Sequence, residues 1–107
     1  SGISFKNRAV KRLDLIGYSK KLSDYLDLEF CFGFQFKYDS NGTPKILECN
    51  PRVQGTMVFS TIMGANMIYS SIKSCLGEDI PQFSINWDTK LLRYWGAVGL
   101  NNNTIKI

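Results

Sequence analysis

The sequence predicts a small α+β domain in which helices accompany an antiparallel hairpin. Three observations predict it: helical spacing of apolar residues over 12–26, strict alternation of apolar and polar residues over 30–38, and an Asn-Gly dipeptide before a second strand-like run. The chain has 107 residues, which suits one modest domain with a single small core. We therefore expect one domain over residues 1–107.

The first predicted element is a helix over residues 12–26. Apolar residues recur there at helical spacing, with charged residues on the other side. The apolar set is Leu15, Tyr18, Leu22 and Leu26, and the charged set is Lys20, Lys21 and Asp24. Gly17 weakens the middle of this helix by about 1 kcal/mol relative to alanine.

The second predicted element is a β-hairpin. Aromatic residues at every second position over 30–38 predict a strand, Asn41-Gly42 favours a two-residue type I′ turn, and Lys45–Asn50 is the returning strand. This turn predicts the pairs Ser40–Thr43, Asp39–Pro44, Tyr38–Lys45, Gln35–Glu48 and Gly33–Asn50. Directly opposed residues share a face, so we expect Gln35, Glu48 and Asn50 on one face and the aromatic row on the other.

The rest of the chain gives weaker signals. Residues 52–66 resemble a loop, and Asn66 is a candidate N-cap for a helix over 67–76 that ends at Gly77. We expect this helix to bury Ile68, Ile72 and Leu76. Residues 91–98 suggest a strand or a covering segment, and 101–107 an exposed end. We divide the chain into a core, residues 1–81, and a C-terminal tail, residues 82–107.

The composition excludes several classes of protein and site. The absence of histidine rules out Ser-His and Cys-His nucleophiles and histidine-ligated zinc within this chain. The three cysteines, Cys31, Cys49 and Cys75, form no CxxC pair and sit among apolar neighbours, which favours small core residues and a reducing cytoplasm. No apolar run is long enough for a membrane span, and the first residues lack a signal-peptide pattern.

The net charge of +4 raises the question of nucleic-acid binding. The basic residues are scattered, with one local excess at Lys6, Arg8, Lys11 and Arg12 that we interpret as a solvated face. This scattered pattern disfavours a nucleic-acid partner. The net positive charge would equally suit small anionic ligands such as phosphates.

The polar face of the hairpin offers a set of hard oxygen ligands. A carboxylate (Glu48) and amide oxygens (Gln35 and Asn50) suit Mg²⁺ or Mn²⁺ rather than zinc, and Mg²⁺ usually takes one or two carboxylates together with phosphates. Arg52 could hold a phosphate or carboxylate through its guanidinium fork. The residues alone leave an alternative open: Glu48 and Asn50 are solvent-facing strand residues, and Pro51 ends the strand.

The segment from Gly33 to Glu78 resembles the C-terminal part of the ATP-grasp fold. The resemblance is closest to the carbamoyl-phosphate synthase large-chain type and its carboxylate–amine ligase relatives, and it covers residues 1–81. It rests on a strand with a glutamine, a hairpin, an E-x-N-P-R motif, a glycine-containing loop, and a helix opening with G-x-N and closing near L-G-E. The matching stretches are Gly33 to Lys37, Glu48 to Arg52, Gly55-Thr56, Gly64 to Asn66 and Leu76 to Glu78.

This resemblance implies an ATP-grasp C-terminal subdomain, an antiparallel sheet with helices packed on one face. It implies that Glu48 bridges two Mg²⁺ (or Mn²⁺) ions, that Asn50 and Gln35 are further ligands, and that Arg52 contacts the transferred phosphate or the substrate carboxylate. The implied reaction is attack of a small carboxylate on the γ-phosphate of ATP, giving an acyl phosphate that an amine-type co-substrate captures. No protein nucleophile is required.

The same resemblance implies that this chain is a fragment of an ATP-grasp domain, whose remaining lobes carry other nucleotide contacts. We expect the isolated chain neither to hydrolyse ATP nor to ligate a substrate. Two other functions remain open: a non-catalytic binding or interaction module that keeps the fold, and a basic nucleic-acid binder, whose affinity would fall steeply with salt.

Overall fold

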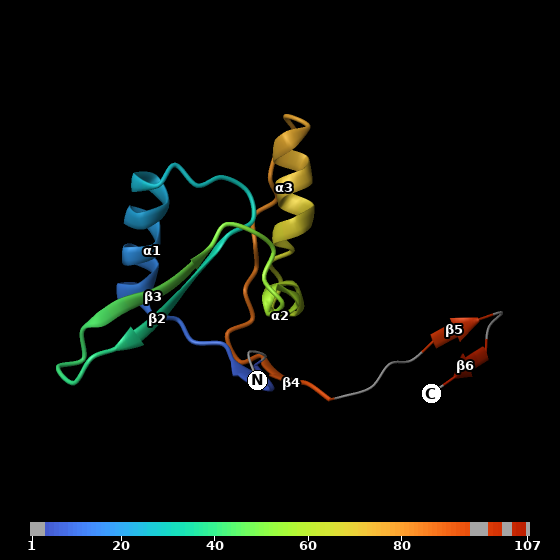
Figure 1. Cartoon of the computed structure of the whole chain (residues 1–107). Coiled ribbons are helices and arrows are strands. Elements are labelled where there is room, and N and C mark those ends of the chain that lie inside the picture. The colour runs from blue at the N-terminus through green and yellow to red at the C-terminus, as the bar shows by residue number, and fades with distance from the viewer. Residues whose placement is uncertain (1–3, 95–98, 102–103, 107) are drawn as a thin grey trace.

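The computed structural model describes residues 4–94, 99–101 and 104–106 (Figure 1). In chain order the elements are β1 (Lys6–Arg8), α1 (Leu13–Tyr25), β2 (Gly33–Tyr38), β3 (Pro44–Asn50), α2 (Met57–Ile62), α3 (Met67–Cys75), β4 (Lys90–Leu92), β5 (Gly99–Asn101) and β6 (Thr104–Lys106). Within these residues the strands form antiparallel pairs, β1 with β4, β2 with β3 and β5 with β6. The predicted α+β class with antiparallel strands is confirmed.

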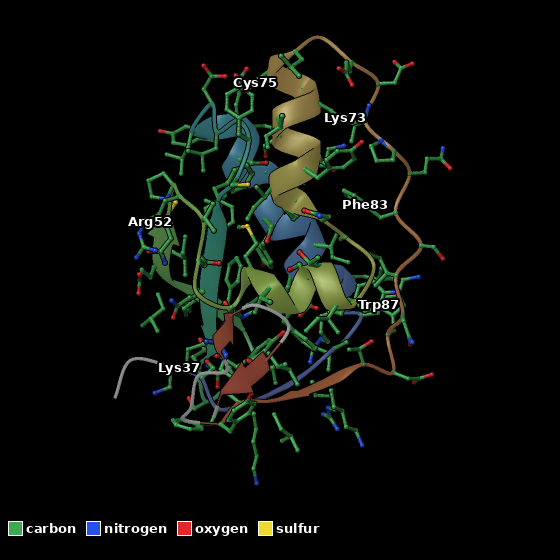
Figure 2. All side chains as sticks on the ribbon, turned by 90° about the vertical axis from the view of Figure 1, so that its right-hand side faces the viewer. Lys37, Arg52, Lys73, Cys75, Phe83 and Trp87 are labelled. Atoms are coloured by element: carbon green, nitrogen blue, oxygen red, sulfur yellow. The ribbon has the colours of Figure 1, made fainter. Side chains whose placement is uncertain are left out.

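Helix α1 lies on the aromatic side of the β2–β3 hairpin. Figure 2 shows α3 with the extended segment that carries Phe83 and Trp87 running alongside it. Along the aromatic side of the hairpin the ring of Phe34 lies 5.7 Å from that of Phe32 and 6.2 Å from that of Phe36, measured between centroids. At its end the Tyr38 hydroxyl donates to the carboxylate of Asp14 on α1 at 3.0 Å. The predicted arrangement, with helices packed on one face of an antiparallel sheet, is therefore confirmed.

Helix α1 confirms the helix predicted over residues 12–26 and begins and ends one residue inside it. Of its predicted apolar face, Leu15 and Leu22 are half-buried, whereas Tyr18 and Leu26 are exposed. The helix therefore makes only a shallow contact with the hairpin, and its first turn is held by the polar contact between Asp14 and Tyr38.

The hairpin turn differs from the prediction. Its loop contains three residues, Ser40, Asn41 and Gly42, and Asn41 lacks the positive φ that a type I′ turn needs. Instead the Asp39 carboxylate accepts the backbone N–H groups of Asn41 at 3.0 Å and Thr43 at 2.9 Å. Of these three loop residues only Gly42, with φ of 74°, enters the left-handed region. Side-chain capping by Asp39 therefore selects a three-residue loop.

The longer loop shifts the strand register by one residue near the turn, and a bulge shifts it back. Tyr38 pairs with Pro44 rather than with Lys45, which corrects the predicted register there. The pairing is irregular between Gln35 and Phe36, where Leu47 is the extra residue of β3. Beyond the bulge the pairs Gln35–Glu48 and Gly33–Asn50 are those predicted. The predicted strand also starts too early, because Phe30 has a φ of 62° and β2 begins at Gly33.

The segment predicted as a loop, residues 52–66, contains the two-turn helix α2. Its β-branched residues and flanking glycines gave no helical signal, and its start is fixed by the Met57 N–H, which donates to the Gln54 carbonyl at 2.9 Å. Met57 is buried at 6% exposure. Tertiary packing thus forms a helix that local propensity does not predict.

Helix α3 confirms its predicted ends but presents a different face inward. Asn66 caps it by accepting the Tyr69 N–H at 3.0 Å, and Gly77 follows its end with φ of 70°. The residues predicted to be buried are instead exposed: Ile68 at 45%, Ile72 at 53% and Leu76 at 67%. Ser70 and Ser71 lie inward in their place.

A physical reason is that both serine hydroxyls are satisfied within the helix. Ser70 Oγ donates to the Asn66 carbonyl at 3.0 Å, and Ser71 Oγ to that of Met67 at 2.9 Å. Their burial therefore leaves no unpaired hydroxyl. Small side chains also let α3 lie close to Cys31, whose sulfur is 3.1 Å from Ser71 Oγ.

After α3 the chain returns as an extended segment that brings β4 to β1. Near the end of α2, the Met63 carbonyl accepts the Asn86 N–H at 2.8 Å. Of the residues predicted as a strand or cover over 91–98, Leu91 and Leu92 belong to β4, and 95–98 lie outside the described residues. The exposure predicted for 101–107 likewise lies outside the described side chains.

The three cysteines are free, but they do not all lie in a core. Cys31 and Cys49 are half-buried, whereas Cys75 is exposed at the end of α3, which corrects its predicted burial. In the described part of the chain the only apolar residues below one-tenth exposure are Ala9, Met57 and Ala65. No helix within it is both long enough and apolar enough to cross a bilayer.

We predict opposite effects for two glycine-to-alanine substitutions. Gly64 has φ of 111°, and an added Cβ would collide with the Ser84 carbonyl oxygen, so Gly64→Ala should lower the free energy of unfolding by about 2 kcal/mol. Gly17→Ala adds a methyl group in open space within α1 and should raise it by about 1 kcal/mol. Urea unfolding followed by circular dichroism measures both. Equal effects would contradict the close approach of Gly64 to residue 84.

We also predict acid sensitivity from the contact between α1 and the hairpin. Hydrogen bonds from the Arg12 guanidinium at 2.9 and 3.1 Å, together with the Tyr38 hydroxyl, lower the pKa of Asp14 from 3.8 to about 2. The stabilisation is complete above pH 3.8 and is lost as pH falls through about 2. The difference in urea midpoint between the wild type and Asp14→Asn should therefore disappear across this range. A difference independent of pH would contradict this prediction.

Candidate functional site

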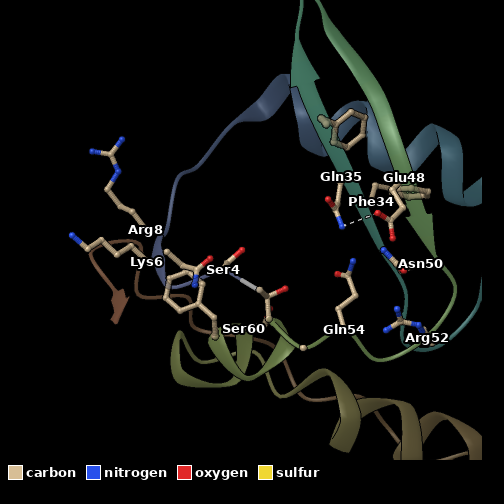
Figure 3. A pocket seen from close by; sticks show the side chains of 15 residues that line it. Ser4, Lys6, Arg8, Phe34, Gln35, Glu48, Asn50, Arg52, Gln54 and Ser60 are labelled. Atoms are coloured by element: carbon tan, nitrogen blue, oxygen red, sulfur yellow. Dashed lines mark hydrogen bonds between the residues drawn. The ribbon is translucent and has the colours of Figure 1, made fainter. Parts of the chain in front are cut away.

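An open cleft of about 760 Å³ lies between β1, the polar face of the hairpin and the segment that leads into α2 (Figure 3). The hairpin contributes Gln35, Glu48 and Asn50, and the following segment contributes Arg52. The structure therefore brings all four residues singled out from the sequence to one cleft. Helix α1 lies behind the hairpin, on the side away from them.

Gln35 and Glu48 face each other across the two strands. Gln35 Nε2 donates a hydrogen bond to Glu48 Oε2 at 3.3 Å. This contact occupies one carboxylate oxygen and orients the side chain toward the cleft, leaving the second carboxylate oxygen and the Gln35 amide oxygen available. Both side chains are exposed to solvent from the cleft side.

Asn50 is the most unusual of the four because it is buried and polar. Only 7% of it is exposed, yet its side chain has no hydrogen-bond partner among the residues that the structure describes. Its amide atoms are not among the fully buried side-chain atoms that lack a partner in the described residues, so they still reach the solvent of the cleft. Since Asn50 lines the cleft at the end of β3, a molecule or water bound there can hydrogen-bond to its amide.

Arg52 lies at the margin of the cleft and is exposed. Its Nη1 donates to the carbonyl of the neighbouring Val53 at 3.1 Å. The other guanidinium N–H groups have no partner among the described residues, so they are free to bind an anion.

Sequence reasoning missed two polar residues of the cleft. The Gln54 amide packs against Gly33, where an added Cβ would collide with Gln54 Oε1. The sequence did contain a signal for this contact, because Gly33 faces Asn50 in the predicted register and a glycine there leaves space for a neighbouring side chain. The second residue is Asn7, whose Nδ2 is buried without a partner in the described part of the chain. A strand of three residues gave no pattern from which to predict it.

Basic residues of β1 and the contacts of Arg93 complete the description of the cleft walls. Lys6 and Arg8, two of the four basic residues predicted to form a solvated face, are exposed and border the cleft from β1. Of the other two, Arg12 pairs with Asp14 and neither lines the cleft. Arg93 donates through Nη2 to the carbonyl of Gly55, a cleft residue, while its backbone N–H donates to Phe5 at 2.8 Å. Arg93 thereby links the segment before α2 to the chain that enters β1.

The charges of the cleft limit what it can bind. Glu48 is the single carboxylate in its lining, and the described residues contain no group of three or more His, Cys, Asp or Glu side chains suited to a metal. A hard cation here would need further oxygen ligands from a phosphate-bearing molecule. Two groups with shifted pKa values, Asp14 and Tyr38, lie outside the cleft lining. The hydrogen bond from Arg12 lowers the pKa of Asp14, whereas desolvation is the main cause that raises the pKa of Tyr38.

Comparison with known proteins identifies one family. The model of the family described as "ATP-grasp in the biosynthetic pathway with Ter operon" matches residues 4–93. No curated protein and no solved structure matches the chain. The matched region contains both walls of the cleft and the E-x-N-P-R motif at Glu48 to Arg52. The chain therefore belongs to this ATP-grasp family, and its membership indicates an ATP-dependent, ligase-type function.

Proposed function

We propose that this cleft binds the phosphates of ATP through Mg²⁺ or Mn²⁺, as part of an ATP-dependent carboxylate–amine ligase of the carbamoyl-phosphate synthase-like type. The observation that carries the proposal is the convergence in one cleft of the Glu48 carboxylate with the amides of Gln35 and Asn50, of which Asn50 is only 7% exposed. A strand residue that merely faced bulk solvent would be far more exposed than Asn50 is.

The donor set fits such a metal. Glu48 retains one free carboxylate oxygen, and Gln35 and Asn50 each offer an amide oxygen. These are the hard ligands that Mg²⁺ prefers, and a single carboxylate leaves coordination positions for phosphate oxygens. Glu48, Asn50 and Gln35 would hold the metal, which when bound neutralises charge on the β- and γ-phosphates.

The proposed reaction begins with a small substrate carboxylate that attacks the γ-phosphate, forming an acyl phosphate and releasing ADP. An amine-type co-substrate then attacks the acyl carbon and displaces phosphate. Arg52 is the proposed catalytic residue, because its free N–H groups can bind the transferred phosphate or the substrate carboxylate. The residues of the cleft would position the reacting phosphate and stabilise the negative charge on it.

The full-length protein would supply contacts that this chain lacks. The carboxylate, the amine and part of the nucleotide would be contacted by remaining lobes of the full-length protein, so the fragment alone should not turn over ATP. A reducing cytoplasm suits three free cysteines, one of them exposed. The competing interpretation, a non-catalytic interaction module, requires no metal in the cleft.

We predict that the chain binds Mg²⁺–ADP and that Glu48→Gln weakens this binding at least about tenfold, because the cleft loses its single carboxylate. An NMR titration measures it through the backbone and side-chain amides of Gln35 and Asn50. With Mn²⁺ in place of Mg²⁺, the same signals should broaden selectively.

Glu29→Gln is the matched control, because Glu29 is exposed and is not part of the cleft lining. It should bind Mg²⁺–ADP as the wild type does. Binding that is unaffected by Glu48→Gln, or equally weakened by both substitutions, would contradict the proposed site and favour an interaction module. ATP turnover by the purified chain that is lost in Glu48→Ala would contradict the expectation that the fragment is inactive.

A further inference from the structure

Gln54 fills the place of a side chain that Gly33 lacks. The three heavy atoms nearest to a Cβ added at Gly33 all belong to the Gln54 amide group. Gly33 pairs with Asn50, and directly opposed residues have Cβ positions about 4.5–5.5 Å apart on one face of a hairpin. The Gln54 amide therefore lies beside Asn50, as the side chain of an asparagine at position 33 would.

The cleft is thus lined by two opposed pairs of polar side chains. Gln35 faces Glu48, and two positions along each strand the Gln54 amide, over Gly33, faces Asn50. Positions two apart on a strand point to the same side of the sheet. Figure 3 shows Gln54 extended from the segment before α2 toward Gln35 and Asn50. One carboxylate and three amides therefore converge, although Gln54 comes from outside the hairpin.

The Gln54 side chain is held in place without a hydrogen bond. Its backbone is fixed, because its carbonyl accepts the Met57 N–H at 2.9 Å. Its amide has no hydrogen-bond partner among the described residues, and neither polar atom of the amide is fully buried. The residue is half-buried by this chain's own residues and lines the cleft, so its amide is accessible to a molecule bound there.

The orientation of the amide favours a donor role. Oε1 is the amide atom nearest to Gly33, whereas Nε2 is 3.1 Å from the place of an added Cβ. The two N–H groups of Nε2 therefore lie on the side of the amide away from Gly33. The metal proposed above already has oxygen ligands in Glu48, Gln35 and Asn50. A phosphate bound to that metal needs hydrogen-bond donors instead.

We propose that Gln54 is a further phosphate-binding residue of this site, donating through Nε2 to an oxygen of the metal-bound phosphate. Gly33 is part of the same arrangement, because a residue without a side chain leaves room for the amide beside Asn50. This inference rests on the proposed function and assigns the contact to the nucleotide's phosphate rather than to the metal.

NMR titrations with Mg²⁺–ADP test this inference. Gln54→Ala should weaken binding about tenfold, because it removes a hydrogen bond to a charged group. Gln54→Glu should weaken binding at least as much, since it keeps the size and an oxygen but replaces the N–H donors by a negative charge. Mn²⁺ without nucleotide should bind Gln54→Ala as it binds the wild type. Gln82→Ala is the matched control, because Gln82 is exposed and lies outside the cleft lining.

Moving the amide to position 33 distinguishes a contact with phosphate from a general effect on the fold. Gly33 does not have a positive φ, so its backbone accepts a side chain, and Gln54→Ala removes the atoms that an added Cβ would meet. The double variant Gly33→Asn, Gln54→Ala should therefore recover most of the affinity for Mg²⁺–ADP that Gln54→Ala loses. Circular dichroism checks that each variant folds.

Three outcomes would overturn the inference. Binding of Mg²⁺–ADP that Gln54→Ala leaves unchanged would overturn it while the proposed function stands. Tighter binding by Gln54→Glu would identify residue 54 as a metal ligand rather than a phosphate donor. Absence of Mg²⁺–ADP binding by the wild type would contradict the proposed function, and this inference with it.

Discussion

The polar side chains of the hairpin meet in the cleft because the β2–β3 register is shifted twice by one residue, in opposite directions. The three-residue loop alone would pair Gln35 with Leu47 and would place Glu48 opposite Phe34, on the aromatic face. The bulge at Leu47 restores the pairing of Gln35 with Glu48 and of Gly33 with Asn50. A local irregularity of one residue thus decides whether a carboxylate faces the cleft or the helices.

The two faces of the hairpin then have separate tasks. The aromatic face meets α1, where the Arg12–Asp14–Tyr38 contact fixes the start of this helix. The polar face forms one wall of the cleft, and β1 forms the other. Arg93 connects these walls through Gly55 and Phe5, so the cleft is a product of contacts between distant segments rather than of the E-x-N-P-R motif alone.

The features predicted from the sequence are those set by near neighbours. The helix over 12–26, the Asn66 cap and the alternation in β2 depend on local spacing, and they are confirmed. The pairing of Gln35 with Glu48 was predicted from a turn type that is wrong, because the unexpected loop and the unexpected bulge cancel.

What the sequence did not predict depends on tertiary contacts. The burial of α3 was assigned to its isoleucines, although serines satisfied within the helix can lie inward instead. Helix α2 and strand β1 are too short for a periodic signal, so Asn7 was not recognised as part of the cleft. Gln54 was missed because its side chain occupies the space that a Cβ at Gly33 would fill, a contact that local spacing does not reveal.

The pairing of β1 with β4 has a consequence for how the protein is made. β1 stands near the start of the chain and β4 follows α3, so closing this pair requires the whole intervening segment. On the ribosome, α1, the hairpin, α2 and α3 are available before β4 emerges, whereas β1 cannot pair with β4 until then. This wall of the cleft is therefore fixed only after β4 has been made, and its formation carries the loop-closure entropy of the segment between β1 and β4.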